Sequence, residues 1–110
     1  MAQQFDFKTL GSPIEADWPV KINVPQDGGA TQVQTLVARL RLLTEQQIKD
    51  IDAQPEAINS ALKAAVVGFG AAEKTTFTPE LLEQMLAVPY VKRALNLAYG
   101  EFSNGISVKN

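Results

Sequence analysis

The side chains that could do chemistry in this sequence are mainly carboxylates, because the chain has no histidine and no cysteine. Histidine is the commonest general base, and a cysteine thiolate is the usual sulfur nucleophile and metal ligand. Asp50 and Asp52 form one carboxylate pair, and Glu80 and Glu83 form another on one helical face. Carboxylate pairs without further ligands make poor metal sites. We therefore interpret both pairs as solvated charges and predict a protein that is not an enzyme, with no catalytic residues, cofactor or metal.

Basic residues are the second candidate for chemistry, and they occur as two small pairs in an acidic chain. Arg39 and Arg41 lie two residues apart, and Lys92 is followed by Arg93. The formal net charge is -2, so no basic field attracts nucleic acid or an anionic membrane. Outward, solubilising charges are the simplest interpretation of both pairs. The sharper hypothesis is that Arg39 and Arg41 guide an acidic protein partner.

The size and composition of the chain indicate what kind of scaffold positions these residues. A chain of 110 residues with 45% hydrophobic and 20% charged residues is typical of one globular domain with its own core. No segment approaches the roughly 20 apolar residues that cross a membrane, and the N-terminal sequence does not resemble a signal peptide. We expect a protein of the cytoplasm.

The first part of the chain is expected to form an arm and a β-hairpin. Residues 1–17 are predicted to be an N-terminal arm that Phe5, Phe7 and Leu10 could dock, although a loosely held terminus fits equally well. Residues 18–24 alternate as a strand does, and Pro19 places that strand at a sheet edge or at its own start. Residues 25–30 predict a turn. Residues 31–43 fit a second strand or one face of a helix, and the pattern alone does not decide between them.

The second part of the chain is expected to form about four helices. Thr44 and Gln47 predict a capping box for a helix that stops before Pro55, and Pro55 would begin the next helix. Thr78 and Pro79 would start the third helix, and Pro89 the last, which ends near Asn104. Apolar stripes predict which side chains face inward: Ile48 and Ile51; Ile58, Ala61, Leu62, Ala65 and Val66, with Gly68-Phe69-Gly70 closing that helix; Leu81, Leu82, Met85 and Leu86; and Val91, Ala94, Leu95, Ala98, Tyr99 and Phe102. The predicted fold class is α+β, an N-terminal β-hairpin followed by about four helices in a single domain.

The order of these features resembles the tail assembly chaperone family of long-tailed bacteriophages. WPVKINVP, a glycine-rich turn and a run ending in LLTEQQI are similar to the first half of that family. FTPELLEQMLAVPYVKRALNLAYGEF is similar to its usual ending. VVGFG occupies the place of a Gly-Trp-Gly-like turn, with Phe69 instead of tryptophan. The resemblance covers about residues 18–104, implies one chaperone-like domain over residues 18–110, and favours a strand at residues 31–43.

The resemblance implies a function and a set of partners. Members of this family bind the long helical tape measure protein in the host cytoplasm, keep it soluble while the tail tube polymerises around it, and are absent from the finished particle. A frameshifted longer form of the chain itself and the tail tube protein are further implied partners, and self-association remains open. Suitable codons for Val108-Lys109-Asn110 would spell a slippery run of adenines. No nucleic acid and no membrane is expected to bind.

No motif of the family marks the client-binding face, so the site is inferred from residue types. We expect a groove between the hairpin and the final helix, with Arg39 and Arg41 attracting the client and apolar lining from Trp18, Leu36, Tyr99 and Phe102. The alternative function is a structural tail-tube or head–tail joining protein that stays in the virion. A third hypothesis is an enzyme or a nucleic-acid binder.

Overall fold

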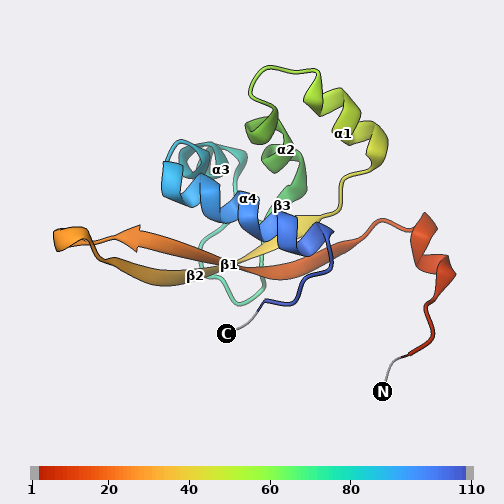
Figure 1. Cartoon of the computed structure of the whole chain (residues 1–110), viewed down its shortest axis with the longest axis horizontal. Helices are drawn as coiled ribbons and strands as arrows, with labels where there is room; N and C mark the ends of the chain where they lie inside the picture. The colour runs from red at the N-terminus through yellow and green to blue at the C-terminus, as the bar shows by residue number, and fades with distance from the viewer. Residues whose placement is uncertain (1–2, 109–110) are drawn as a thin grey trace.

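The computed structural model describes residues 3–108 and shows a three-stranded antiparallel sheet with helices packed on one of its faces (Figure 1). The strand order is β1-β2-β3, and the β1–β2 hairpin precedes all four α-helices of the described residues. This arrangement confirms the predicted α+β class. The elements are a 3-10 turn at Phe7–Gly11, β1 (Glu15–Pro25), a 3-10 turn at Asp27–Gly29, β2 (Thr31–Arg41), α1 (Glu45–Asp52), α2 (Ala57–Ala65), β3 (Val66–Phe69), α3 (Pro79–Leu86) and α4 (Pro89–Ser103).

The hairpin register explains how a proline can lie inside β1. Ile14 accepts a 2.8 Å hydrogen bond from the backbone N–H of Leu42, so in the ladder that continues from this pair the even-numbered residues of β1 face β2. Pro19, which pairs with Val37, therefore directs its missing N–H to the open side of β1. The prediction of an edge strand at Pro19 is confirmed. The strand itself begins at Glu15 instead of Trp18, so the last residues assigned to the N-terminal arm belong to the sheet.

Residues 31–41 form a strand, which resolves the ambiguity left by the sequence pattern. Gly28 and Gly29 both adopt a positive φ, 82° and 85°, and the 2.8 Å hydrogen bond from Gln26 to Ala30 closes the turn. A hairpin so closed favours a second strand over a helix. Ala38 and Leu40 are buried beneath the helices, whereas Arg39 and Arg41 alternate onto the opposite face.

The sequence analysis was wrong about residues 66–70. It extended the second helix through Val66 and took Gly68-Phe69-Gly70 as its end, but α2 ends at Ala65 and residues 66–69 form β3. β-branched Val66 and Val67 fit a pleated strand, and the open edge of β2 supplies the pairing partner. Gly70 is required for close approach, because an added Cβ would lie 2.6 Å from Cγ1 of Val37.

Three further helix predictions need correction. Pro55 does not begin α2: Glu56 is the N-cap, in a left-handed conformation at φ 57°, and the helix starts at Ala57. Ile48 and Ile58, predicted to face inward, are exposed. Ile48 lies on α1, which packs mainly against α2, and Ile58 lies in the first turn of α2, at the end that is remote from β3 (Figure 1), so fewer elements are available to cover them.

The predicted helix caps are confirmed. Thr44 and Gln47 form a complete capping box at α1, in which the backbone N–H of Gln47 donates a 3.1 Å hydrogen bond to the Thr44 hydroxyl. The Thr78 hydroxyl accepts from the Leu81 amide at 3.1 Å, and Pro79 occupies the first turn of α3. Gly105 follows α4 with a φ of 68° and ends the chain's longest helix, as expected.

The core lies between the sheet and the helices, and α4 crosses β1 above it (Figure 1). It contains most of the predicted inward residues of α3 and α4 together with one face of the hairpin, whereas Leu81, also predicted to face inward, is not part of it. Its buried members are Val20, Ala38, Leu40, Leu62, Val66, Leu82, Leu86, Ala94, Leu95 and Ala98.

The two ends of the described chain are less enclosed. Phe5, Phe7 and Leu10 are exposed, so the arm is not docked through them; Phe5 and Phe7 pack edge to face on each other at 5.0 Å. Lys109 and Asn110, two of the residues in the frameshift hypothesis, lie outside the described residues. Between residues 3 and 108 the structure has no helix with the length and apolar composition needed to cross a membrane.

Candidate protein-binding groove

The structure brings three of the predicted client-binding residues into one aromatic cluster between β1 and α4. The Trp18 and Phe102 rings meet edge to face at 5.5 Å, and Tyr99 lies 6.2 Å from Phe102. All three are partly buried and pack against the core. They therefore join the final helix to the hairpin and leave little apolar surface for a client.

Tyr99 also has a polar structural contact. Its hydroxyl accepts a 3.0 Å hydrogen bond from the backbone N–H of Leu43, a residue just beyond β2 that is only 6% exposed. This bond ties α4 to the chain where β2 passes into α1. Leu36 pairs with Val20, two positions along the ladder from the Trp18–Ala38 pair, and packs against the core.

Arg39 and Arg41 lie on the opposite face of the sheet from this cluster. Arg41 makes a 2.8 Å ion pair with Glu15, and Arg39 reaches Asp17 at 3.2 Å and Glu15 at 3.4 Å. The Arg41 hydrogen bond, supported by the charges of Arg41 and Arg39, lowers the pKa of the Glu15 carboxyl below its ordinary 4.5. Because β1 already supplies carboxylates to both arginines, their charge is largely matched within the chain.

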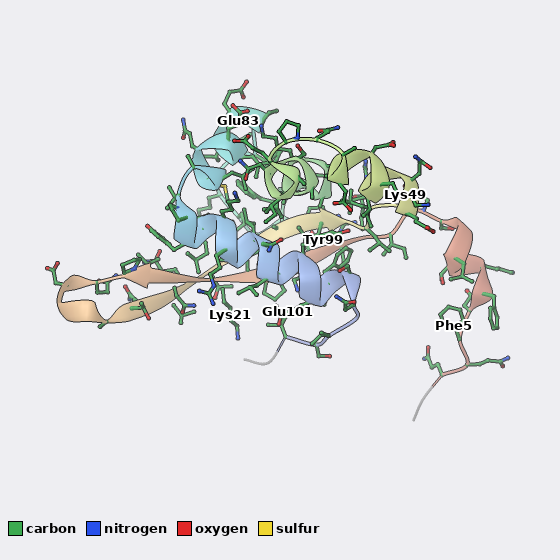
Figure 2. All side chains as sticks on the ribbon, turned by 45° about the horizontal axis from the view of Figure 1, so that its top comes forward. Phe5, Lys21, Lys49, Glu83, Tyr99 and Glu101 are labelled. Carbon is green, nitrogen blue, oxygen red and sulfur yellow. The ribbon has the colours of Figure 1, made fainter. Side chains whose placement is uncertain are left out.

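A groove does lie between the hairpin and the final helix, but other side chains line it. It has a volume of about 430 Å³, and Lys21 of β1, labelled in Figure 2, is one of the residues that line it. Tyr90, Arg93 and Leu97 follow one another at i, i+3 and i+7, which places them on one face of α4. The full lining is Lys21, Asn23, Thr31, Tyr90, Arg93, Ala94 and Leu97.

The chemistry of this groove is that of a contact surface. Leu97 is 57% exposed and Tyr90 is 38% exposed, so this face of α4 presents apolar surface to solvent. The charged lining residues, Lys21 and Arg93, are both cationic. An apolar strip beside the cationic Arg93 fits an amphipathic segment whose own apolar strip is bordered by carboxylates.

The sequence carried a signal for this groove that the prediction did not use. Leu97 falls outside the inward stripe of the final helix, on its polar side, where a leucine has no core to enter. Arg93 was interpreted only as a solubilising charge, and Tyr90 was assigned to no site. Reading the polar side of the helix for apolar residues would have found Tyr90 and Leu97 together.

Other sites are weaker candidates. A larger hollow of about 970 Å³ lies where the arm meets the ends of β1 and β2, and its charged lining residues, Glu15 and Arg41, are already paired with each other. Within residues 3–108 no cluster of carboxylates could hold a metal ion. Comparisons with family models, with curated proteins and with solved structures find no match to the chain.

Proposed function

We propose that this chain is a bacteriophage tail assembly chaperone that binds the tape measure protein in the host cytoplasm. It keeps this client soluble during tail morphogenesis and is not retained in the virion. The observation that carries the proposal is the exposed Leu97 and Tyr90 strip between α4 and the hairpin, with Arg93 on the same face of the helix. The ordered resemblance of residues 18–104 to the chaperone family supports it.

In the proposed mechanism the chain binds reversibly to a helical client and covers its apolar surface. A long amphipathic helix exposes an apolar stripe that associates with other copies unless a partner shields it. Such helices bind grooves through apolar residues at i, i+3 or i+4, and i+7. On α4, Tyr90 and Leu97 offer apolar contact two turns apart, and Arg93 between them carries a positive charge that attracts carboxylates beside the stripe. Binding of this kind needs no bond made or broken and no nucleotide.

Co-expression with the tape measure protein tests the proposal. The soluble fraction of that protein should rise with the native chain and should not rise with Leu97→Asp. Removing one leucine contact from a binding surface costs about 2 kcal/mol, or about 30-fold in affinity. Ile58→Asp is the matched control, because Ile58 is comparably exposed on α2, away from the groove. Equal solubilisation by the native chain and Leu97→Asp would remove the groove from the proposal.

The second candidate is a structural tail-tube or head–tail joining subunit, and the open edge of β2 is the observation that favours it. Only residues 38–40 of β2 pair with β3, and a free strand edge is a template for pairing with another chain, which in a head-to-tail contact can close a ring. A gel of purified particles separates the two functions: the chaperone is absent, whereas a structural subunit is present in many copies.

The frameshifted longer form stays a proposal about the gene. We expect codons 108–110 to contain a run of adenines on which the reading frame slips. Codons without such a run would remove this form from the set of partners, and the proposed chaperone function would not depend on it.

A further inference from the structure

The far end of the hairpin projects from the molecule as a two-stranded ribbon (Figure 1). Every residue from Thr31 to Thr35 is exposed, including Val33, which is 57% exposed. The helices thus cover the later half of β2 and leave its first half bare. Isolated two-stranded ribbons are marginally stable in water, so this end of the sheet is suited to gaining a further strand.

The hydrogen-bonding groups on the outer edge of this ribbon can be assigned from the contacts of Val37. Its carbonyl accepts from Gly70 at 2.8 Å, and its N–H donates to the Glu73 carboxylate at 2.8 Å, both on the side away from β1. Odd-numbered residues of β2 therefore direct their backbone groups outward. Thr31, Val33 and Thr35 follow the same alternation, beyond the reach of β3, which pairs only with residues 38–40.

The two edges of the ribbon differ in how they are protected. On β1 the outward positions include Pro19 and Pro25, which have no N–H to offer another strand. On β2 no proline and no charged residue occurs between Asp27 and Arg39. Natural sheets usually protect a free edge with such residues, so the unprotected β2 edge is where a strand would add.

The sequence of this edge is palindromic. Residues 31–35 read Thr-Gln-Val-Gln-Thr, the same in both directions. We propose that two copies of the chain pair through this segment as antiparallel strands, related by a two-fold axis at Val33. An isologous contact of this kind joins identical patches and closes on itself. The proposal goes beyond the chaperone function and does not depend on it.

The pairing places chemically matched groups opposite one another. Val33 lies opposite its own counterpart, and Thr31 lies opposite Thr35 of the second copy, with about six backbone hydrogen bonds from the outward groups. Gln32 faces Gln34 across the ladder, and Thr–Thr and β-branched pairs are favourable cross-strand neighbours. A contact limited to so few residues predicts a weak dimer that forms with rising concentration.

Single cysteines test the register, because the native chain has none and any disulfide must join two copies. Val33→Cys places the two cysteines opposite each other, about 5.5 Å apart between Cα atoms, which suits a disulfide. Thr35→Cys is the matched control: its two copies lie four residues apart along the ladder, about 13 Å, which is too far. Mild oxidation should give covalent dimer from the first variant and much less from the second. Equal cross-linking by both would overturn the proposed register.

Opposite charges at the axis test the symmetry. Val33→Lys and Val33→Glu should each be monomeric by sedimentation at concentrations where the native chain dimerises, since like charges then meet at the axis. An equimolar mixture of the two variants should restore a dimer. Ile58→Lys, a comparable exposed position outside the hairpin, should dimerise as the native chain does.

Several results would contradict the proposal. A native chain that stays monomeric at every concentration removes the dimer, and open-ended oligomers remove the two-fold axis. A mixture that dimerises no better than either charged variant removes Val33 from the contact. Circular dichroism on each variant distinguishes loss of association from loss of fold, and the exposure of Val33 predicts that the fold is kept.

Discussion

Replacing Tyr99 with phenylalanine tests whether the aromatic cluster between β1 and α4 is structural. The substitution removes one hydroxyl and keeps the ring that packs 6.2 Å from Phe102. The N–H of Leu43 then loses its 3.0 Å acceptor in a place that is almost closed to solvent. Neighbouring packing is otherwise unchanged, so the effect reports the lost hydrogen bond.

The size of the effect follows from the burial of Leu43. A buried donor left without its acceptor costs about 1–3 kcal/mol of unfolding free energy. For a chain of this length the entropy of unfolding converts that loss into a fall in Tm of about 4–13 °C. Removing a hydroxyl at the surface would cost much less unfolding free energy, since water replaces the missing hydrogen-bond partner.

Thermal and urea unfolding followed by circular dichroism measure this loss. Tyr90→Phe is the matched control, because the described part of the chain gives the Tyr90 hydroxyl no hydrogen-bond partner and the ring is partly exposed. Its Tm should change by less than about 2 °C, as for an ordinary surface substitution. Tyr99→Phe as stable as Tyr90→Phe would refute the structural assignment of Tyr99 and return that residue to the list of client contacts.

Three further substitutions, one of them with a matched control, test the packing and electrostatics of the fold. Glu15→Gln removes a carboxyl whose pKa is lowered in the folded state. The lowered pKa stabilises the folded state above pH 4.5, and this contribution is lost as the pH falls through the lowered value. The Tm of the native chain should therefore fall more steeply on acidification than the Tm of the variant. Leu95→Ala, at a fully buried position, should cost about 2–5 kcal/mol in urea unfolding, whereas Leu97→Ala should cost less than about 0.5 kcal/mol. Gly70→Ala should destabilise the fold by about 1–3 kcal/mol, because the added Cβ would clash with Val37. A variant of native stability would show that Val37 and the edge of β2 can shift to make room for the methyl group.

Most of the helices and strands could be predicted from residues that act locally in the sequence. Capping residues such as Thr44 and Thr78 act on their own helix, and the glycines of the hairpin turn act within a few residues, so their effects can be read without tertiary context. The stripe of α4 was equally clear because its period persists for the whole helix. Pro19 indicated an edge strand for a reason that is wholly local, the absence of an N–H.

The features that the sequence did not reveal depend on contacts between distant segments. β3 is a strand because residues 38–40 of β2 offer it an edge, and Val66 alone continues the stripe of α2 equally well. In the sequence the aromatic residues of the expected client site look like any other apolar residues, and only the packing of α4 on β1 shows that they lie between the two elements. Arg39 and Arg41 looked available to a partner because Glu15 had been assigned to an arm outside the sheet.

The most direct test of the proposed function is the soluble fraction of the tape measure protein when it is expressed with and without this chain. We predict a clear rise with the native chain and no rise with Leu97→Asp, while Ile58→Asp solubilises as the native chain does. A tape measure protein that stays equally insoluble with the native chain and without it would contradict the chaperone account.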